Sequence, residues 1–171
     1  MASKLSKAVT AAVASGASAA AILALFLNEA EGLKLRAYQD GAKIWTICRG
    51  HTSGVKPGDL ASREQCDAFF QSDVGEAFAA TDRLVNVPMS EPQRAGVTSF
   101  CTYNIGPDAC SKSTFLRKLN AGDRRGACNA ILDWVYITVN GRKYDCRTPG
   151  NERCAGIPTR REAERELCLL D

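Results

Sequence analysis

The chain begins with a long uncharged stretch. Residues 8–27 contain no charged side chain and follow Lys4 and Lys7. A stretch of this length can cross a hydrocarbon core of about 30 Å, and the two lysines would hold its N-terminal end in the cytoplasm. Ala, Gly, Ser and Thr dominate its first two-thirds, whereas the strongly apolar residues cluster from Ile22 to Leu27. The pattern therefore predicts a weak transmembrane helix that leads the rest of the chain outward.

A cleaved signal peptide is the alternative for this stretch, because Ala17-Ser18-Ala19 has the A-x-A form of a cleavage site. That site would precede the strongest apolar cluster, which reverses the order found in signal peptides. We therefore expect an uncleaved anchor, with residues 1–28 as the membrane segment and residues 29–171 as the globular domain.

The pattern after the anchor predicts a small antiparallel sheet at the front of the domain. Strands are expected at residues 33–38 and 43–48, because Asp40-Gly41 between them is a turn signal. Further along, Asn140-Gly141 predicts a second hairpin over residues 135–146.

Helical signals fill most of the remaining domain. Ser62 with Gln65 and Ser90 with Gln93 have the spacing of a capping box at a helix start. Helices are expected over residues 62–84, 90–103, 113–119, 123–134 and 158–169. Residues 29–171 therefore form a single α+β domain, a small sheet followed by a mainly helical lobe.

The charge of the chain excludes one class of partner. It has 22 basic and 19 acidic residues and a formal net charge of +3, of which Lys4 and Lys7 supply two units. A chain without a basic stripe lacks the electrostatic footprint of a nucleic-acid-binding protein.

Eight cysteines, all after residue 47, indicate four disulfides formed in an oxidising compartment. Structural zinc is disfavoured, because the sequence has no C-x-x-C pair and only one histidine, and we expect no metal and no cofactor. Eight cysteines allow 105 pairings. The short loops make Cys101–Cys110 and Cys146–Cys154 natural pairs, and spacing leaves the remaining pairing open.

Two carboxylates and a hydroxyl lie close together in the sequence at the front of the domain. Glu31 is followed by Asp40 and then by Thr46, and a helix end followed by a hairpin can face these side chains across a cleft. Glycoside hydrolysis requires one protonated and one ionised carboxyl group on either side of the scissile bond. By spacing alone the signal is weak, since most Asp and Glu residues are solvated.

The segments EGLKLRAYQD and WTICRGHT resemble the signature E-G-x-x-L-x-x-Y-x-D and W-T-I-G-x-G-H-T of the phage-type lysozymes, glycoside hydrolase family 24. SFCTYNIG, STFLRKLNAGD and PTRREAERELC resemble later segments of that family, in the same order. The N-terminal run is similar to the Ala- and Gly-rich anchors of signal-arrest-release endolysins from lambdoid phages. The resemblance covers residues 29–170 and implies a lysozyme-like α+β fold.

The resemblance implies a role for each matching residue. Glu31 would be the general acid, Asp40 would orient or activate the attacking water, and Thr46 would help to hold it. Tyr103 and Asn104 fall where the family lines its substrate cleft, and Arg160 falls where a family arginine approaches the glutamate. His51, the only histidine, matches a position with a structural role.

The resemblance also implies two disulfides, and the sequence departs from the family twice. Related endolysins carry cysteines at the positions of Cys48 and Cys66 and of Cys128 and Cys168, which implies these two pairs. Cys48 and Arg49 replace the family's usual glycine and the residue after it. The segment at residues 135–154 is longer than its equivalent in the family, which puts the shape of that lobe in question.

These implications predict an endolysin that hydrolyses the β-1,4 bond between N-acetylmuramic acid and N-acetylglucosamine in peptidoglycan glycan strands. We expect a monomer that is tethered, inactive, to the host inner membrane through residues 8–27 and is then released into the periplasm. Two alternatives remain: a lytic transglycosylase, which needs no positioned water, and a non-catalytic, disulfide-rich wall-binding domain.

Overall fold

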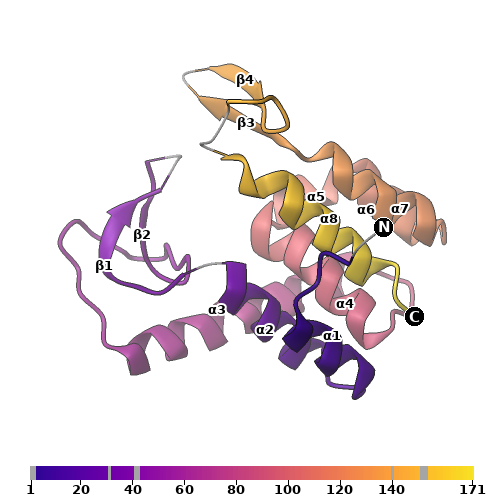
Figure 1. The fold of residues 1–171 in the computed structure, drawn as a ribbon, viewed down its shortest axis with the longest axis horizontal. Coiled ribbons are helices and arrows are strands. Elements are labelled where there is room, and N and C mark those ends of the chain that lie inside the picture. The colour runs from indigo at the N-terminus through magenta and orange to yellow at the C-terminus, as the bar shows by residue number, and fades with distance from the viewer. Residues whose placement is uncertain (1–2, 31, 41–42, 140, 151–153) are drawn as a thin grey trace.

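A computed structural model describes residues 3–30, 32–40, 43–139, 141–150 and 154–171 of the protein. The chain forms a small β lobe and a larger helical body, joined by a long helix, α3 (Arg63–Leu84) (Figure 1). Helix α3 begins at the predicted capping box, in which Ser62 accepts a hydrogen bond from the Gln65 N–H and the Gln65 side chain accepts one from the Ser62 N–H. The observed architecture is therefore the expected α+β fold with two lobes.

The β lobe consists of a two-stranded antiparallel sheet over the start of α3. Strands β1 (Lys34–Gln39) and β2 (Trp45–Cys48) pair with Tyr38 opposite Thr46, close to the predicted strands. Ala37, Ile47, Cys48 and Cys66 form the core of this lobe. The disulfide between Cys48 and Cys66 ties β2 to α3.

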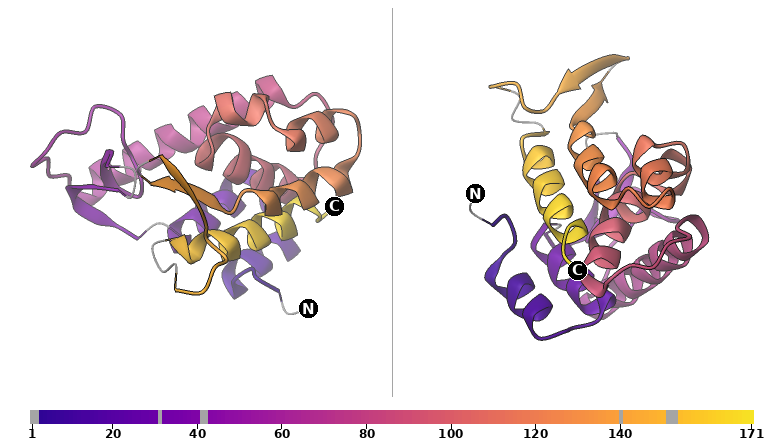
Figure 2. Two further views of the ribbon diagram at one scale, coloured as in Figure 1. Left: turned by 90° about the horizontal axis from the view of Figure 1, so that it is seen from above. Right: turned by 90° about the vertical axis from the view of Figure 1, so that its right-hand side faces the viewer.

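The helices after α3 pack around an apolar core. They are α4 (Glu91–Val97), η1 (Thr98–Asn104), α5 (Pro107–Ser111), α6 (Thr114–Asn120), α7 (Arg124–Ala130), η2 (Ile131–Asp133) and α8 (Gly156–Cys168). Phe100, Phe115, Leu119 and Ile131 lie at the centre of this core, fully buried. Figure 2 shows α8 running along the body beside these helices.

The predicted helix over residues 90–103 is in fact two elements. It starts as an α-helix at the Ser90 cap, and from Thr98 it continues as the π-helix η1. Single π-turns inside α-helices occur frequently at functional sites. Here the π-turn carries Tyr103 and Asn104, two residues expected to line the cleft.

A second hairpin projects from the body. Strands β3 (Tyr136–Val139) and β4 (Arg142–Asp145) pair in register from Tyr136–Asp145 to Val139–Arg142, as the Asn-Gly signal predicts. The hairpin stands clear of the helices on the side of the β lobe (Figures 1 and 2).

The N-terminal stretch differs from the expectation of one membrane-spanning helix. It forms two helices, α1 (Lys7–Ala14) and α2 (Ala19–Ala30), because Gly16 adopts a left-handed φ of 72° that ends α1. Within the described residues no helix is long and apolar enough to cross a membrane. The apolar residues Ile22, Leu23 and Leu27 instead lie buried in a cluster with residues of α3, α4 and α8.

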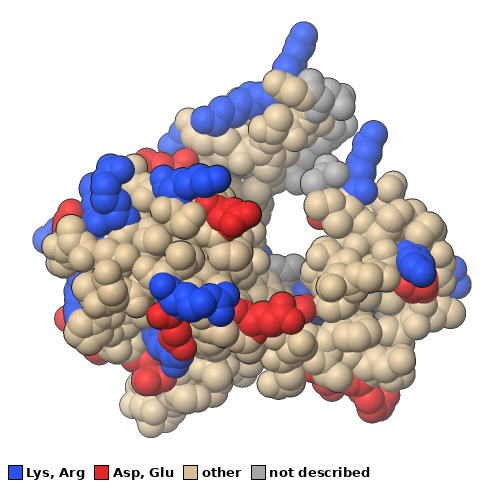
Figure 3. Space-filling view, turned by 180° about the vertical axis from the view of Figure 1, so that it is seen from behind, with Lys and Arg blue, Asp and Glu red and all other residues tan. Residues whose placement is uncertain are grey.

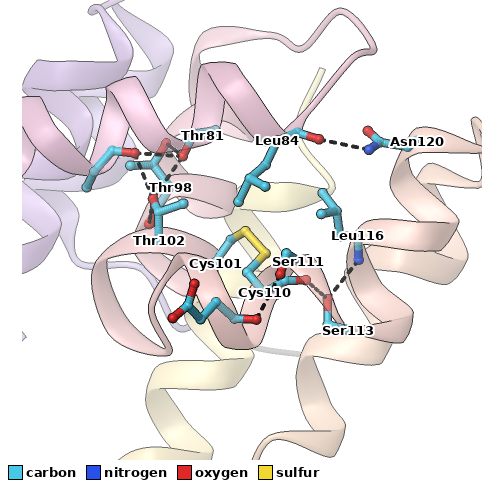
Figure 4. The surroundings of a disulfide bond; sticks show 12 residues. Thr81, Leu84, Thr98, Cys101, Thr102, Cys110, Ser111, Ser113, Leu116 and Asn120 are labelled. Carbon is cyan, nitrogen blue, oxygen red and sulfur yellow. Dashed lines mark hydrogen bonds between the residues drawn. A yellow bond between two sulfur atoms is a disulfide. The ribbon is translucent and has the colours of Figure 1, made fainter.

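All eight cysteines are paired, as Cys48–Cys66, Cys101–Cys110, Cys128–Cys168 and Cys146–Cys154. These are the pairs that the short loops and the family resemblance had indicated. Figure 4 shows Cys101–Cys110 between η1 and α5, near a buried hydroxyl cluster in which Thr81 contacts Thr98 at 3.0 Å and Thr102 at 2.9 Å. The hydroxyl cluster and the disulfide therefore fix η1 from both sides.

Candidate active site

Of the three residues expected to carry the chemistry, the structure describes Asp40 and Thr46, which lie at β1 and β2. Glu31 lies outside the described residues; in the sequence it directly follows Ala30, the last residue of α2. Asp40 follows the end of β1, and Thr46 lies within β2.

Asp40 and Thr46 lie on the same face of the hairpin. Tyr38 pairs with Thr46, and Asp40 is two residues beyond Tyr38, so the period of two places all three side chains on one side. The Asp40 carboxylate accepts a hydrogen bond from the Ile44 N–H at 2.9 Å. The Thr46 hydroxyl donates to the Ile44 carbonyl at 3.0 Å, and its side chain is buried, with the residue 3% exposed. Both side chains are therefore held by hydrogen bonds to the backbone of the same residue, Ile44.

Tyr103 connects the helical body to the β lobe. Its hydroxyl donates a hydrogen bond to the Arg49 carbonyl oxygen at 3.2 Å, so η1 meets the end of β2. A groove of about 450 Å³ lies beside this contact. Its polar lining residues are Thr52, Ser53, Asp73, Glu76, Arg83, Thr102 and Tyr103. Tyr103 therefore lines this groove, whereas Asp40 and Thr46 are not among its lining residues. The assignment of Tyr103 to the substrate cleft stays a prediction.

His51 does not act as an isolated base in this arrangement. Its Nδ1 lies 2.9 Å from Asp73 Oδ2, and its ring stacks on Phe69 with a centroid distance of 4.3 Å. Burial raises the pKa of Asp73, and the hydrogen bond from His51 opposes that rise. The pair links the β lobe to α3, which is the structural role expected for this histidine.

A buried charge cluster on α8 contacts Asn104, a residue that the resemblance assigns to the substrate cleft. Glu164 of α8 is fully buried and accepts hydrogen bonds from Ser99 Oγ at 2.8 Å, from Arg160 Nε at 3.2 Å and from the Arg161 guanidinium. Arg161 also donates to the Asn104 side-chain oxygen. Arg160, whose side chain is 15% exposed, is therefore part of an internal network with Glu164.

Sequence reasoning missed Arg161 and Glu164. Both lie in the RREAE segment, where Glu164 is three residues from Arg161 and four from Arg160. Residues at these spacings share one face of a helix, so the signal was present, but surface ion pairs have the same spacing. Within the described residues no group of acidic, His or Cys side chains could hold a metal ion.

Comparison with known proteins identifies the same group of relatives by sequence and by structure. A sequence model described as "Phage lysozyme" matches residues 28–164. A "SAR-endolysin" of Escherichia phage 933W is 50% identical over 167 residues, which are 95% of this chain and 92% of the relative.

Two solved structures support this grouping. The muramidase domain of SpmX from Asticaccaulis excentricus has a TM-score of 0.74 and 30% identity, covering 87% of this chain and 95% of that chain. An endolysin from Escherichia coli O157:H7 phage FAHEc1 has a TM-score of 0.71 and 32% identity, covering 88% and 90%.

Proposed function

The chain belongs to the phage lysozyme family, and on this basis we propose that Glu31, Asp40 and Thr46 are the catalytic residues of a peptidoglycan-hydrolysing endolysin. The reaction is cleavage of the β-1,4 bond between N-acetylmuramic acid and N-acetylglucosamine. The observation that carries the assignment is the shared face of Asp40 and Thr46 on the β1–β2 hairpin, both bonded to the backbone of Ile44.

Each residue has a distinct task in the proposed reaction. Glu31, protonated, donates its proton to the leaving glycosidic oxygen, while ionised Asp40 takes a proton from the attacking water. The Thr46 hydrogen is already donated to the Ile44 carbonyl, so the Thr46 oxygen offers a lone pair to that water. Attack from the face opposite the leaving group inverts the anomeric carbon.

The buried cluster around Glu164 helps to keep the general acid protonated. An arginine close to Glu31 would favour the ionised form of that glutamate. Glu164 accepts hydrogen bonds from both Arg160 and Arg161, and its charge offsets one of their two positive charges. The positive potential at the glutamate is therefore smaller than Arg160 and Arg161 together would produce without Glu164.

We further propose that residues 8–27 tether an inactive form to the inner membrane, and that the fold described here is the released form. The apolar side chains Ile22, Leu23 and Leu27 are buried in the domain. They cannot contact lipid and pack against α4 and α8 at the same time. The name of the phage 933W relative, a "SAR-endolysin", supports this cycle of anchoring and release.

The catalytic assignment is tested with purified full-length protein on peptidoglycan. Glu31→Gln is expected to lower turnover by at least a hundredfold, while Glu29→Gln, a carboxylate two residues away, serves as the matched control. Undiminished wall degradation by Glu31→Gln would exclude Glu31 as the general acid, whereas wall binding without any degradation by the wild type would support the non-catalytic binding domain. Mass spectrometry of the wild-type products decides the chemistry: a reducing-end muramic acid is expected, and a 1,6-anhydro product would instead identify a lytic transglycosylase.

A further inference from the structure

The β3–β4 hairpin is anchored beside the candidate site. Arg161 donates from Nε to the Trp134 carbonyl at 3.0 Å and from a terminal nitrogen to Asn104. One guanidinium thus contacts both Asn104 and the residue just before the hairpin. At about 3.3 Å per residue, the four-residue strand β3 extends roughly 13 Å from this point.

The hairpin is held in a defined orientation. The Cys146 N–H donates to the Val135 carbonyl at 2.8 Å, which closes the base of the hairpin, and the disulfide to Cys154 links this base to the start of α8. A surface that is already ordered binds a ligand with less loss of conformational entropy. The hairpin can therefore present its side chains at a fixed position.

The end of the hairpin away from the body is cationic. Arg142 and Lys143 are exposed, and among the described residues neither has a carboxylate within ion-pair distance. The Lys143 ammonium lies 4.1 Å from the centre of the Tyr136 ring. By contrast, the Arg147 guanidinium nearer the base is bonded to Asp145.

The space-filling view places this charge at an opening in the molecule. Figure 3 shows an opening between the β lobe, the helical body and the hairpin, with Lys and Arg side chains gathered on the hairpin above it. A polymer lying in this opening would pass close to the cationic end. Carboxylate groups attached along that polymer would find complementary charge there.

We propose that Arg142 and Lys143 bind the anionic peptide stems that branch from the glycan strands of peptidoglycan. This inference rests on the proposed function, since it takes the glycan strand as the substrate of the neighbouring site. The stems carry free carboxylates, and two cations on the hairpin that have no ion-pair partner among the described residues can contact them while the strand lies between the lobes.

The test compares Arg142→Gln/Lys143→Gln with wild type on two substrates: solubilised glycan strands with intact stems, and the same strands with the stem carboxylates converted to amides. On intact stems the double variant is expected to raise KM threefold to tenfold with kcat unchanged. On amidated stems the two enzymes should have the same KM. The wild-type advantage should also decline between 0.05 and 1 M salt, because screening shortens the range of the charges.

Lys112→Gln/Arg117→Gln is the matched control, because it removes one exposed lysine that directly follows α5 and one exposed arginine of α6. An unchanged KM of the hairpin variant on intact stems, or an equal rise on both substrates, would overturn the proposal. So would an unchanged KM combined with loss of binding to phosphatidylglycerol vesicles, which would assign the cations to the membrane. Absence of wild-type activity on both substrates would instead count against the proposed function itself.

Discussion

Glu164 is a carboxylate with no exposed surface, and two arginines of its own helix converge on it. Burying a charge is costly unless it is paired and hydrogen-bonded, and removing one partner leaves the others uncompensated. Because Arg161 contacts both Glu164 and Asn104, the position of Asn104 relative to α8 depends on this cluster.

Glu164→Gln is expected to lower the free energy of unfolding by about 3 kcal/mol, because it leaves the buried Arg161 and the partly buried Arg160 with reduced compensation. Urea unfolding measures the change. The control is Glu162→Gln in the same helix, where the pair with Lys4 is about half exposed and the expected loss is below about 1 kcal/mol. Equal effects of the two substitutions would contradict the buried-charge explanation.

Cys48 adopts a φ of 60°, in the left-handed region. A residue with a side chain is strained there by roughly 1–2 kcal/mol, whereas glycine is not. The family resemblance places glycine at this position, so the cysteine gains a disulfide to Cys66 at the expense of backbone strain.

The strain can be measured without the disulfide. In a Cys66→Ala background, Cys48→Gly is expected to be about 1 kcal/mol more stable than Cys48→Ala, because glycine adopts the left-handed conformation freely. Thermal and urea unfolding of the two double variants provide the comparison. A more stable alanine variant would show that the backbone at this position is relaxed.

Among the elements, β2 and α3 are connected by the disulfide and by the His51–Asp73 pair. Burial raises the pKa of Asp73 above its ordinary value. The folded protein therefore holds a proton on Asp73 more tightly than the unfolded chain does, and this group adds stability as the pH falls toward 3.8.

Wild type is therefore expected to gain stability relative to Asp73→Asn as the pH is lowered from 7 to about 4. The gain should occur between the raised pKa of Asp73 and its ordinary value, and it should be absent above that range. Urea unfolding of both proteins at a series of pH values measures it. If the difference instead moved in favour of the asparagine variant on acidification, the pKa of Asp73 would be lowered in the folded state.

At the scale of the whole molecule, residues 8–27 can be covered either by the membrane or by the folded domain. Residues 8–27 are uncharged, yet in the folded domain they form α1 and α2 and bury one side against the body. Carboxylates of the body complete the contact: Glu91 accepts a hydrogen bond from the Ala19 N–H, and Glu166 accepts one from the Lys4 N–H. The equilibrium between the membrane-inserted form and the domain-packed form therefore depends both on how favourably this stretch enters lipid and on how well it packs against the body.

Leucine substitutions on the exposed face of residues 8–27 can strengthen membrane insertion without changing how this stretch packs against the domain. Gly16 is unsuitable because of its positive φ, and Ala19 is only 1% exposed. Replacing the exposed residues Ala11, Ala14 and Ala20 by leucine should strengthen anchoring by about 1–2 kcal/mol, or roughly tenfold in the release equilibrium.

The leucine variant is expected to accumulate in the membrane fraction and to delay lysis, whereas serine at the same positions should not retain the protein. Cell fractionation and lysis timing measure both effects. Lysis on the wild-type schedule by the leucine variant would refute the release mechanism and make cleavage after Ala19 the better explanation.

Local sequence signals were sufficient for much of this architecture. The Ser62–Gln65 capping box, the Asp-Gly and Asn-Gly turns and the pairing of neighbouring cysteines all act within a few residues, so they persist in any environment. The pattern of Glu31, Asp40 and Thr46 stays a prediction, and its specificity comes from the resemblance of the surrounding segments.

Long-range packing determined the rest. The π-turn at Thr98–Asn104, the internal position of Glu164 and the docking of α1 and α2 all depend on surfaces distant in the sequence. An apolar face or an i,i+4 ion pair has the same appearance whether lipid, water or another helix covers it. The free energy of burial decides whether lipid, water or another helix covers such a face. The surface that another helix would pack against exists only once the chain has folded.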